Sequence, residues 1–150
     1  MRVHIASDHA GFELKALLVA HLQVARHDVV DHGATIYDPD DDYPGFCFAA
    51  AEATVADRGS LGIVIGGSGN GEAIAANKVD GVRAALVWNV EIAQLARAHN
   101  NANVMAIGAR QHPVTADVVA FVDAFLAEPF SNGRHQRRID QLTAYERSRA

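Results

Sequence analysis

The residues best suited to chemistry lie in one glycine-rich stretch, GGSGNGE, at positions 66–72. It follows the apolar run LGIVI, which is typical of a buried strand, and it precedes the helical pattern AIAANK. Its first six positions hold four glycines, which indicates a backbone that comes close to a ligand, because glycine adds no side chain. We therefore predict that Gly67, Gly69, Asn70 and Gly71 bind substrate.

Glu72 argues against a permanently charged phosphate in this loop, because a carboxylate repels an anion. No Gly-Lys-Ser/Thr follows, as a nucleotide P-loop requires, and Ile74 stands where the dinucleotide fingerprint needs a glycine or alanine. A carboxylate beside backbone N–H groups suits proton abstraction next to a carbonyl, since those groups stabilise the resulting enediolate. We expect Glu72 to be the general base. The alternatives are a flavodoxin-like mononucleotide site and an acid that only favours the first turn of a helix.

The one dense basic cluster is RHQRR at 134–138. On a helix, Arg134 and Arg138 lie one turn apart on the same face, and arginine forks match phosphate oxygens. The net charge of the chain is −5, which disfavours a nucleic-acid partner. We expect this cluster to bind a small phosphate group, with a solvated basic face as the alternative.

Further candidates follow the first expected strand and end an expected helix. Asp8 and His9 come directly after the strand, and His99 stands beside Asn100 at the helix end. The acids of DPDDD at 38–42 are also candidate metal ligands, but no HxxH or HxH spacing supports a metal site and we expect none. The remaining histidines are assigned structural roles: His4, His21, His27, His32 and His112.

Short β-rich runs alternate with helical patterns along the chain. Strands are expected at 3–6, 28–32, 61–65, 82–87 and 103–108, and helices at 44–56, 71–78, 90–99, 114–127 and about 132–147. This order predicts a three-layer α/β sandwich with a parallel sheet. Ligands of such sheets bind beyond the carboxyl ends of the strands. SDHAG (7–11), GGSGNGE (66–72), WN (88–89) and GAR (108–110) fall there.

Two expected helices differ in their apolar faces. The first helix, which follows SDHAG, is predicted to have a broad apolar face that comprises Leu14, Leu17, Leu18 and Leu22. Lys15 is expected to lie outside this face. Pro113 is expected in the first turn of the helix at 114–127. The tail helix at about 132–147 has only a narrow apolar stripe that includes Leu142, which suits a helix laid across a partner subunit.

Length and composition are those of an ordinary soluble chain. The 150 residues suit one domain, residues 1–150, with 49% apolar and 21% charged residues. The only cysteine, Cys47, cannot form an intrachain disulfide, which fits a reducing compartment, and we assign it to the core. No signal peptide or membrane span is recognisable. We expect a cytoplasmic protein that binds neither nucleic acid nor membrane.

Taken together, the motifs resemble ribose-5-phosphate isomerase of type B, in the family shared with the galactose-6-phosphate isomerase subunits. They are, in chain order, SDHAG at 7–11, DYP at 42–44, GGSGNGEAIAANK at 66–78, RAHNNAN at 97–103 and RHQRRID at 134–140. The resemblance covers nearly the whole chain. It implies a Rossmann-like sheet of five parallel strands and a homodimer, or alternatively a tetramer, with shared active sites. It also implies interconversion of ribose 5-phosphate and ribulose 5-phosphate without metal or cofactor.

The same resemblance implies roles in proton transfer. In the mycobacterial-type variant, a glutamate at the position of Glu72 is the base. Ser68 stands where many family members carry a cysteine base, and it is expected to contribute a hydroxyl to the enediolate. Asp8 and His99 look like the pair that opens the furanose ring.

Substrate-binding roles follow by the same matching. His9, Arg134 and Arg138 look like phosphate ligands, and Tyr43 looks like a wall against the sugar. The residues expected to reach in from the neighbouring subunit are His99, Asn100 and Arg110.

Two other activities remain as alternatives. One is an isomerase of another aldose or ketose phosphate, with six or four carbons. The other is a non-catalytic binding module of flavodoxin-like fold, which Glu72 disfavours because a pure binder needs no base.

Overall fold

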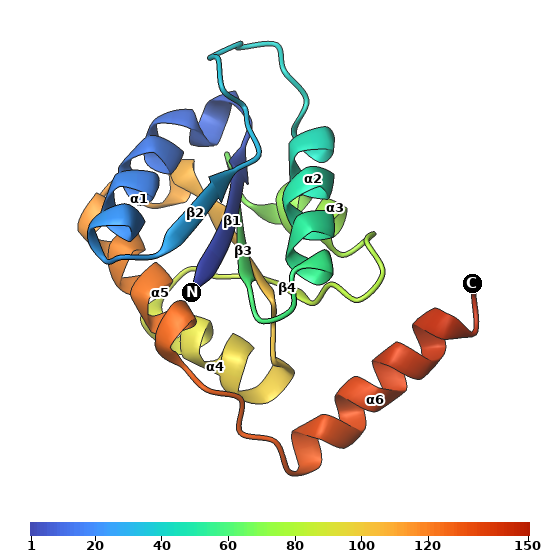
Figure 1. Cartoon of the computed structure of the whole chain (residues 1–150). Coiled ribbons are helices and arrows are strands. Elements are labelled where there is room, and N and C mark those ends of the chain that lie inside the picture. Colours follow the sequence, from blue (N-terminus) through green and yellow to red (C-terminus); the bar gives the residue numbers. More distant parts are fainter.

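The computed structural model describes residues 1–150 and contains one five-stranded sheet with the order β2-β1-β3-β5-β4 (Figure 1). All strand pairings are parallel, so the carboxyl ends of the strands share one edge. This confirms the predicted parallel sheet, although the fourth strand is shorter than expected. The strands are β1 (Arg2–Ser7), β2 (Asp28–Asp31), β3 (Leu61–Gly66), β4 (Ala84–Leu86) and β5 (Val104–Gly108).

Helices cover both faces of the sheet and complete the three layers. On one face lie α1 (Phe12–Val24), α4 (Val90–Asn100) and α5 (Thr115–Ala127), and there α1 and α5 pack bulky side chains into the core with β1, β3 and β5, whereas α4 contributes mainly alanines. On the other face, α2 (Tyr43–Ala56) and α3 (Asn70–Ala76) pack mostly through alanines. Small side chains allow α2 and α3 to approach the strands closely. None of the helices is both long and apolar enough to cross a bilayer.

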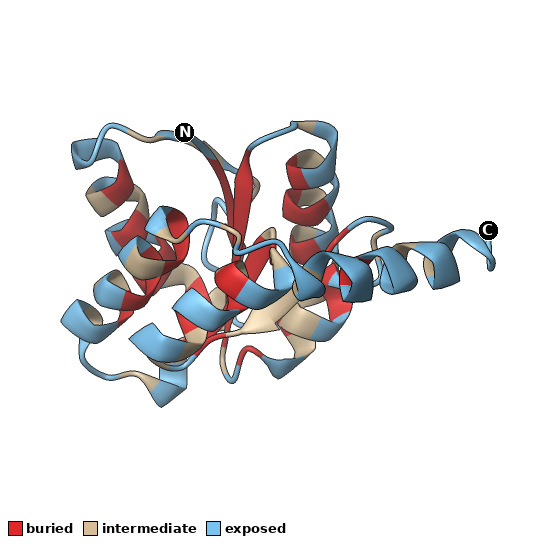
Figure 2. Ribbon diagram, turned by 90° about the horizontal axis from the view of Figure 1, so that it is seen from below, coloured by how far each residue is buried: buried red, intermediate tan, exposed pale blue.

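The tail forms α6 (Arg134–Arg147), which reaches away from the body of the molecule (Figures 1 and 2). Ile139 is its only buried residue, while Leu142 and Tyr145 are 57% and 65% exposed. Near its end, the Glu146 carboxylate accepts a hydrogen bond from the Gly81 N–H at 3.0 Å. The predicted tail helix is therefore present, and its apolar stripe is largely uncovered within one chain.

The buried face of α1 differs from the prediction. Lys15 is only 3% exposed, whereas Leu17 is 53% exposed. The Lys15 ammonium donates hydrogen bonds of 2.7 Å to Asp31 Oδ1 and to the Ala34 carbonyl. These partners allow a charged side chain to be buried, because its hydrogen-bonding groups stay satisfied. Pro113 also lies just before α5, whose N-cap is Val114, rather than in the first turn.

Candidate active site

The glycine loop at 66–71 leaves β3 at the carboxyl edge of the sheet and enters α3, as expected. Gly69 is the N-cap of α3 with a φ of 81°, in the left-handed region that glycine adopts without strain. A Cβ atom on Gly69 would also lie 2.6 Å from the Leu86 side chain. The Ser68 hydroxyl accepts a hydrogen bond from the Asn70 N–H at 3.3 Å. The loop is therefore a tight turn that brings the Ser68 hydroxyl to the start of α3.

Glu72 is buried beneath this loop, with 3% of its surface exposed. A Cβ atom on Gly66 would overlap the Glu72 carboxylate, so the glycine creates the space in which that carboxylate lies. Burial raises the pKa of Glu72 above its ordinary value, the Asp8 carboxylate raises it further, and the N–H groups of Glu72 and Gly69 oppose the shift. A buried carboxylate with a raised pKa is well suited to accept a proton from a substrate carbon.

Asp8 lies directly after β1 and caps the short 3₁₀ helix His9–Gly11. Its Oδ1 accepts hydrogen bonds from Ala10 N at 2.9 Å and Gly11 N at 3.3 Å. Its Oδ2 makes no hydrogen bond within the chain and lies 4.0 Å from His9 Nδ1. One oxygen of Asp8 is thus held by the backbone, and the other is available to a ligand.

Tyr43 and Arg110 border the glycine loop. A Cβ atom on Gly71 would lie 2.6 Å from the Tyr43 ring, and one on Gly67 would lie 3.0 Å from Arg110 Nη1. The Arg110 N–H also donates to the Gly67 carbonyl at 3.0 Å. Because β5 pairs with β3, the residues that follow β5 reach the loop of the same chain. The expectation that Arg110 reaches in from a neighbouring subunit is therefore wrong.

The remaining predicted residues gather at the opposite edge of the sheet. Helix α4 runs back from the end of β4 to the start of β5, so His99 and Asn100 in its last turn lie at the amino edge. His99 stacks on His135 of α6, with ring centroids 4.2 Å apart and an interplanar angle of 11°. Desolvation lowers the pKa of His135, and the neighbouring His99, Arg134 and Arg138 lower it further, so the arginines of α6 lie close to this ring.

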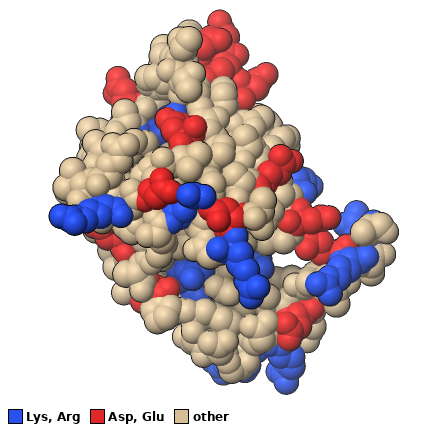
Figure 3. Space-filling model, viewed as in Figure 1, with Lys and Arg blue, Asp and Glu red and all other residues tan.

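Two groups of predicted residues therefore occupy opposite edges of the sheet. Asp8 and Glu72 belong to the carboxyl-edge group, whereas His99 and Arg138 belong to the amino-edge group. The end of α4 and the start of α6 lie well below the glycine loop in Figure 1. Within one chain, Asp8 and His99 do not form a pair. Figure 3 shows acidic side chains over the long loop at the top of the molecule and most basic ones in the lower half of that face.

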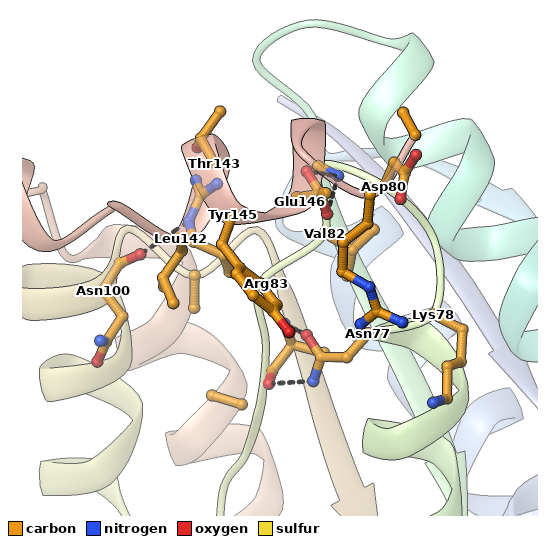
Figure 4. Close-up of a pocket in the computed structure, with 16 residues that line it drawn as sticks. Asn77, Lys78, Asp80, Val82, Arg83, Asn100, Leu142, Thr143, Tyr145 and Glu146 are labelled. Atoms are coloured by element: carbon orange, nitrogen blue, oxygen red, sulfur yellow. Dashed lines mark hydrogen bonds between the residues drawn. The ribbon is translucent and has the colours of Figure 1, made fainter. Parts of the chain in front are cut away.

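A hollow of about 760 Å³ also lies at the amino edge, between α6 and the segment 77–83 (Figure 4). Arg83 lies beside this hollow and donates hydrogen bonds of 2.9 Å to the carbonyls of Asn100 and Asn101. The hollow contains no residue of the glycine loop. It separates α6 from the sheet rather than forming part of the carboxyl-edge site.

Cys47 is buried in α2 with 1% of its surface exposed, which confirms its assignment to the core. Burial raises the pKa of its thiol to about 12, and the Glu72 and Asp8 carboxylates contribute to the shift. The thiol is therefore protonated at neutral pH and is a poor nucleophile.

Most of the histidines assigned to structural roles contact another side chain of the same chain. His4 Nδ1 and His32 Nε2 share a hydrogen bond of 2.9 Å, and His21 bonds Asp123 at 2.8 Å. The His112 ring meets Phe121 edge-on at 5.0 Å. His27 Nδ1 is buried without a partner.

Asp41 was missed as an individual site residue. It lies in the long loop before α2, and its Oδ1 accepts hydrogen bonds from the His9 N–H at 3.0 Å and from Nδ1 at 2.7 Å. In the sequence it is one of several acids in DPDDD, and only its place just before DYP distinguishes it. Asp8, His9 and Asp41 each offer a ligand atom within 4.8 Å of the others. The expectation that no metal binds stays a prediction.

Comparison with known proteins agrees with this architecture. Residues 3–142 match the model of the Ribose/Galactose Isomerase family. The chain is 62% identical over 149 residues to ribose-5-phosphate isomerase B of Mycolicibacterium paratuberculosis, covering 99% of this chain and 93% of that protein. It is 60% identical over 149 residues to the protein of the same name in Mycobacterium tuberculosis, covering 99% and 91%.

Solved structures show the same fold. Ribose-5-phosphate isomerase B from Mycoplasma genitalium with bound ribulose 5-phosphate superposes with a TM-score of 0.93 at 44% identity, covering 97% of this chain and 96% of that one. Ribose-5-phosphate isomerase B from Clostridium thermocellum gives a TM-score of 0.96 at 37% identity over the full length of both chains. Because both the family model and these relatives match nearly the entire chain, the chain belongs to the ribose/galactose isomerase family.

Proposed function

We propose that the chain is an aldose-ketose isomerase that interconverts D-ribose 5-phosphate and D-ribulose 5-phosphate, with residues 1–150 as one catalytic domain. The observation that carries the proposal is Glu72, a buried carboxylate of raised pKa beside a glycine loop at the carboxyl edge of the sheet. Relatives at 60% and 62% identity are named ribose-5-phosphate isomerase B, and a related structure contains ribulose 5-phosphate. These relatives favour a pentose phosphate over a six- or four-carbon sugar.

The chemistry assigned to the carboxyl-edge group is proton transfer between two carbons. Glu72 takes the proton from C2 of the open-chain aldose, and electrons move to the carbonyl oxygen to form the enediolate. The Ser68 hydroxyl and the backbone N–H groups of the loop hydrogen-bond the oxygen that becomes negative. The proton of the C2 hydroxyl passes to the C1 oxygen, C2 becomes the carbonyl carbon, and Glu72 returns its proton to C1, which yields the ketose. The reaction needs no external oxidant, because one carbon is oxidised as its neighbour is reduced.

The separation of the two groups supports a shared site in a homodimer, with a tetramer as the alternative assembly. Asp8 needs a partner to open the furanose ring, and His99 of the same chain lies at the opposite edge of the sheet. A second copy can supply His99 and Asn100, together with the arginines of α6. The exposed Leu142 and Tyr145 of α6 provide apolar surface for such a contact. A cytoplasmic location is part of the proposal, since the single buried thiol suits a reducing compartment.

A coupled ketose assay over a panel of aldose phosphates tests the activity. We expect turnover of ribose 5-phosphate and much weaker turnover of hexose and tetrose phosphates, with Glu72→Gln as the inactive control. Preferential turnover of a hexose 6-phosphate would assign a different sugar. Absence of turnover with every sugar phosphate would refute the proposed enzyme class.

Mixing two inactive variants tests the shared site. In heterodimers of Glu72→Gln and His99→Ala, one site carries both changes and the other carries neither, by two-fold symmetry. Random reassembly should therefore restore about a quarter of all sites. The matched control is Glu72→Gln mixed with Arg110→Ala, which should restore none, because Arg110 lies at the loop of its own chain. If native mass spectrometry detects heterodimers and neither mixture regains activity, the shared site is wrong.

A further inference from the structure

We propose that Asp41 is a positioning residue that holds the His9 imidazole so that its protonated Nε2 contacts the substrate phosphate. The inference rests on the proposed function and on the role of His9 as a phosphate ligand. Asp41 belongs to the long loop between β2 and α2, and His9 follows β1. Two segments that are separate in sequence thus combine to present one ring.

The contacts between the two residues fix both the backbone and the ring of His9. Asp41 Oδ1 accepts hydrogen bonds from the His9 N–H at 3.0 Å and from Nδ1 at 2.7 Å. The Asp41 side chain is 10% exposed and that of His9 is 24% exposed, so the pair is mostly shielded from water. The Tyr37 ring meets the imidazole edge-on, with centroids 6.5 Å apart. The orientation of the ring is therefore set before any ligand binds.

This arrangement leaves Nε2 free, because no group of the chain hydrogen-bonds to it. The proton on Nδ1 is directed to Asp41, so Nε2 carries a proton only when the ring is an imidazolium. A neutral ring would present a lone pair to a phosphate oxygen, whereas the cation presents an N–H donor. The acceptor oxygen of Asp41 orients the ring, and its negative charge favours the imidazolium form that donates from Nε2 to a phosphate.

The groups around His9 shift its pKa in opposite directions. Its pKa is raised, chiefly by the hydrogen bond to Asp41 and also by the charges of Asp8 and Asp41, while desolvation and Arg110 oppose the shift. Asp8 Oδ2 lies 4.0 Å from Nδ1, beyond hydrogen-bond distance. Asp41 Oδ2 is buried without any partner, so its contact with His9 is the only side-chain interaction that Asp41 makes. The geometry thus assigns Asp41 to His9 rather than to the stability of its loop.

Two substitutions separate the charge of Asp41 from its geometry. Asp41→Asn keeps an oxygen acceptor but removes the charge, and Asp41→Ala removes both. The matched control is Asp42→Asn, which removes the same charge from an exposed neighbour. The measurements are kcat and KM for ribose 5-phosphate from about pH 6 to about pH 8, together with the His9 pKa from imidazole NMR.

For Asp41→Asn, we expect a lower His9 pKa and a KM close to wild type at the acidic end that rises up to about tenfold at the basic end. For Asp41→Ala, KM should be raised throughout, and kcat should change little in both variants. Asp42→Asn should match wild type. An unchanged His9 pKa in Asp41→Asn, or a loss of kcat with unchanged KM, would overturn the proposal.

Binding of inorganic phosphate to wild type and Asp41→Asn, followed by NMR of the His9 ring, separates this inference from the proposed activity. Weaker phosphate binding by Asp41→Asn at the basic end would support the role of Asp41 even if ribose 5-phosphate were not turned over. Equal binding by the two proteins at every pH would refute that role while leaving the isomerase activity intact.

Discussion

Replacing Glu72 with glutamine tests the assignment of the base with little change in shape. Glutamine fits the space above Gly66 that the carboxylate now occupies, but it cannot accept the substrate proton. General base catalysis contributes about 10²- to 10⁴-fold in rate, which corresponds to about 2.7 to 5.4 kcal/mol in the activation free energy. Exchange of the C2 hydrogen of ribose 5-phosphate with deuterated water should fall by that factor.

The pH dependence provides a second measure of the same residue. Because burial raises the pKa of Glu72, the acid limb of kcat/KM in the wild type should lie above pH 4.5, the ordinary value for a glutamate. Below that limb the base is protonated and cannot act. The limb should be absent from the residual activity of Glu72→Gln.

Stability should change in the opposite direction from activity. A carboxyl whose pKa is raised by folding stabilises the protein below its unfolded pKa, and this contribution is lost as pH rises through the folded pKa. Glu72→Gln should therefore unfold at higher urea concentration than wild type at about pH 8, with the difference shrinking as pH falls. If the C2 hydrogen of ribose 5-phosphate still exchanged at a near-normal rate in Glu72→Gln, a residue other than Glu72 would be the base. Lower stability at the basic end would show that the loop N–H groups outweigh burial.

Two further substitutions test the surroundings of this carboxylate. Gly66→Ala should lower both activity and melting temperature, because the added Cβ overlaps the Glu72 carboxylate. If this variant exchanged the C2 hydrogen of the substrate at the wild-type rate, the close contact between Gly66 and the Glu72 carboxylate would be contradicted. Cys47→Ala should keep full activity and cost about 1 kcal/mol of unfolding free energy, measured in urea, since the thiol is buried and protonated. Loss of turnover in a folded Cys47→Ala protein would instead make the thiol part of the chemistry.

The sequence by itself determined the order of strands and helices and the position of the glycine loop. Apolar periodicity shows where each element lies, and the alternation of strand and helix requires parallel strands whose carboxyl ends share an edge. Glu72 and Asp8 were found because each follows a strand closely. The apolar pattern was less reliable for α1, where Lys15 can be buried because Asp31 and the Ala34 carbonyl accept hydrogen bonds from its ammonium group.

Only the tertiary structure decided which side chains meet. Arg110 lies at the glycine loop of its own chain because β5 is adjacent to β3, and this spatial order differs from the order in the sequence. Asp41 contacts His9 because the long loop folds back over β1, and no periodic pattern governs the path of a loop. His99 is directed away from Asp8 because α4 runs antiparallel to the strands. A linear sequence records neighbours along the chain, whereas a site depends on contacts between segments that packing brings together.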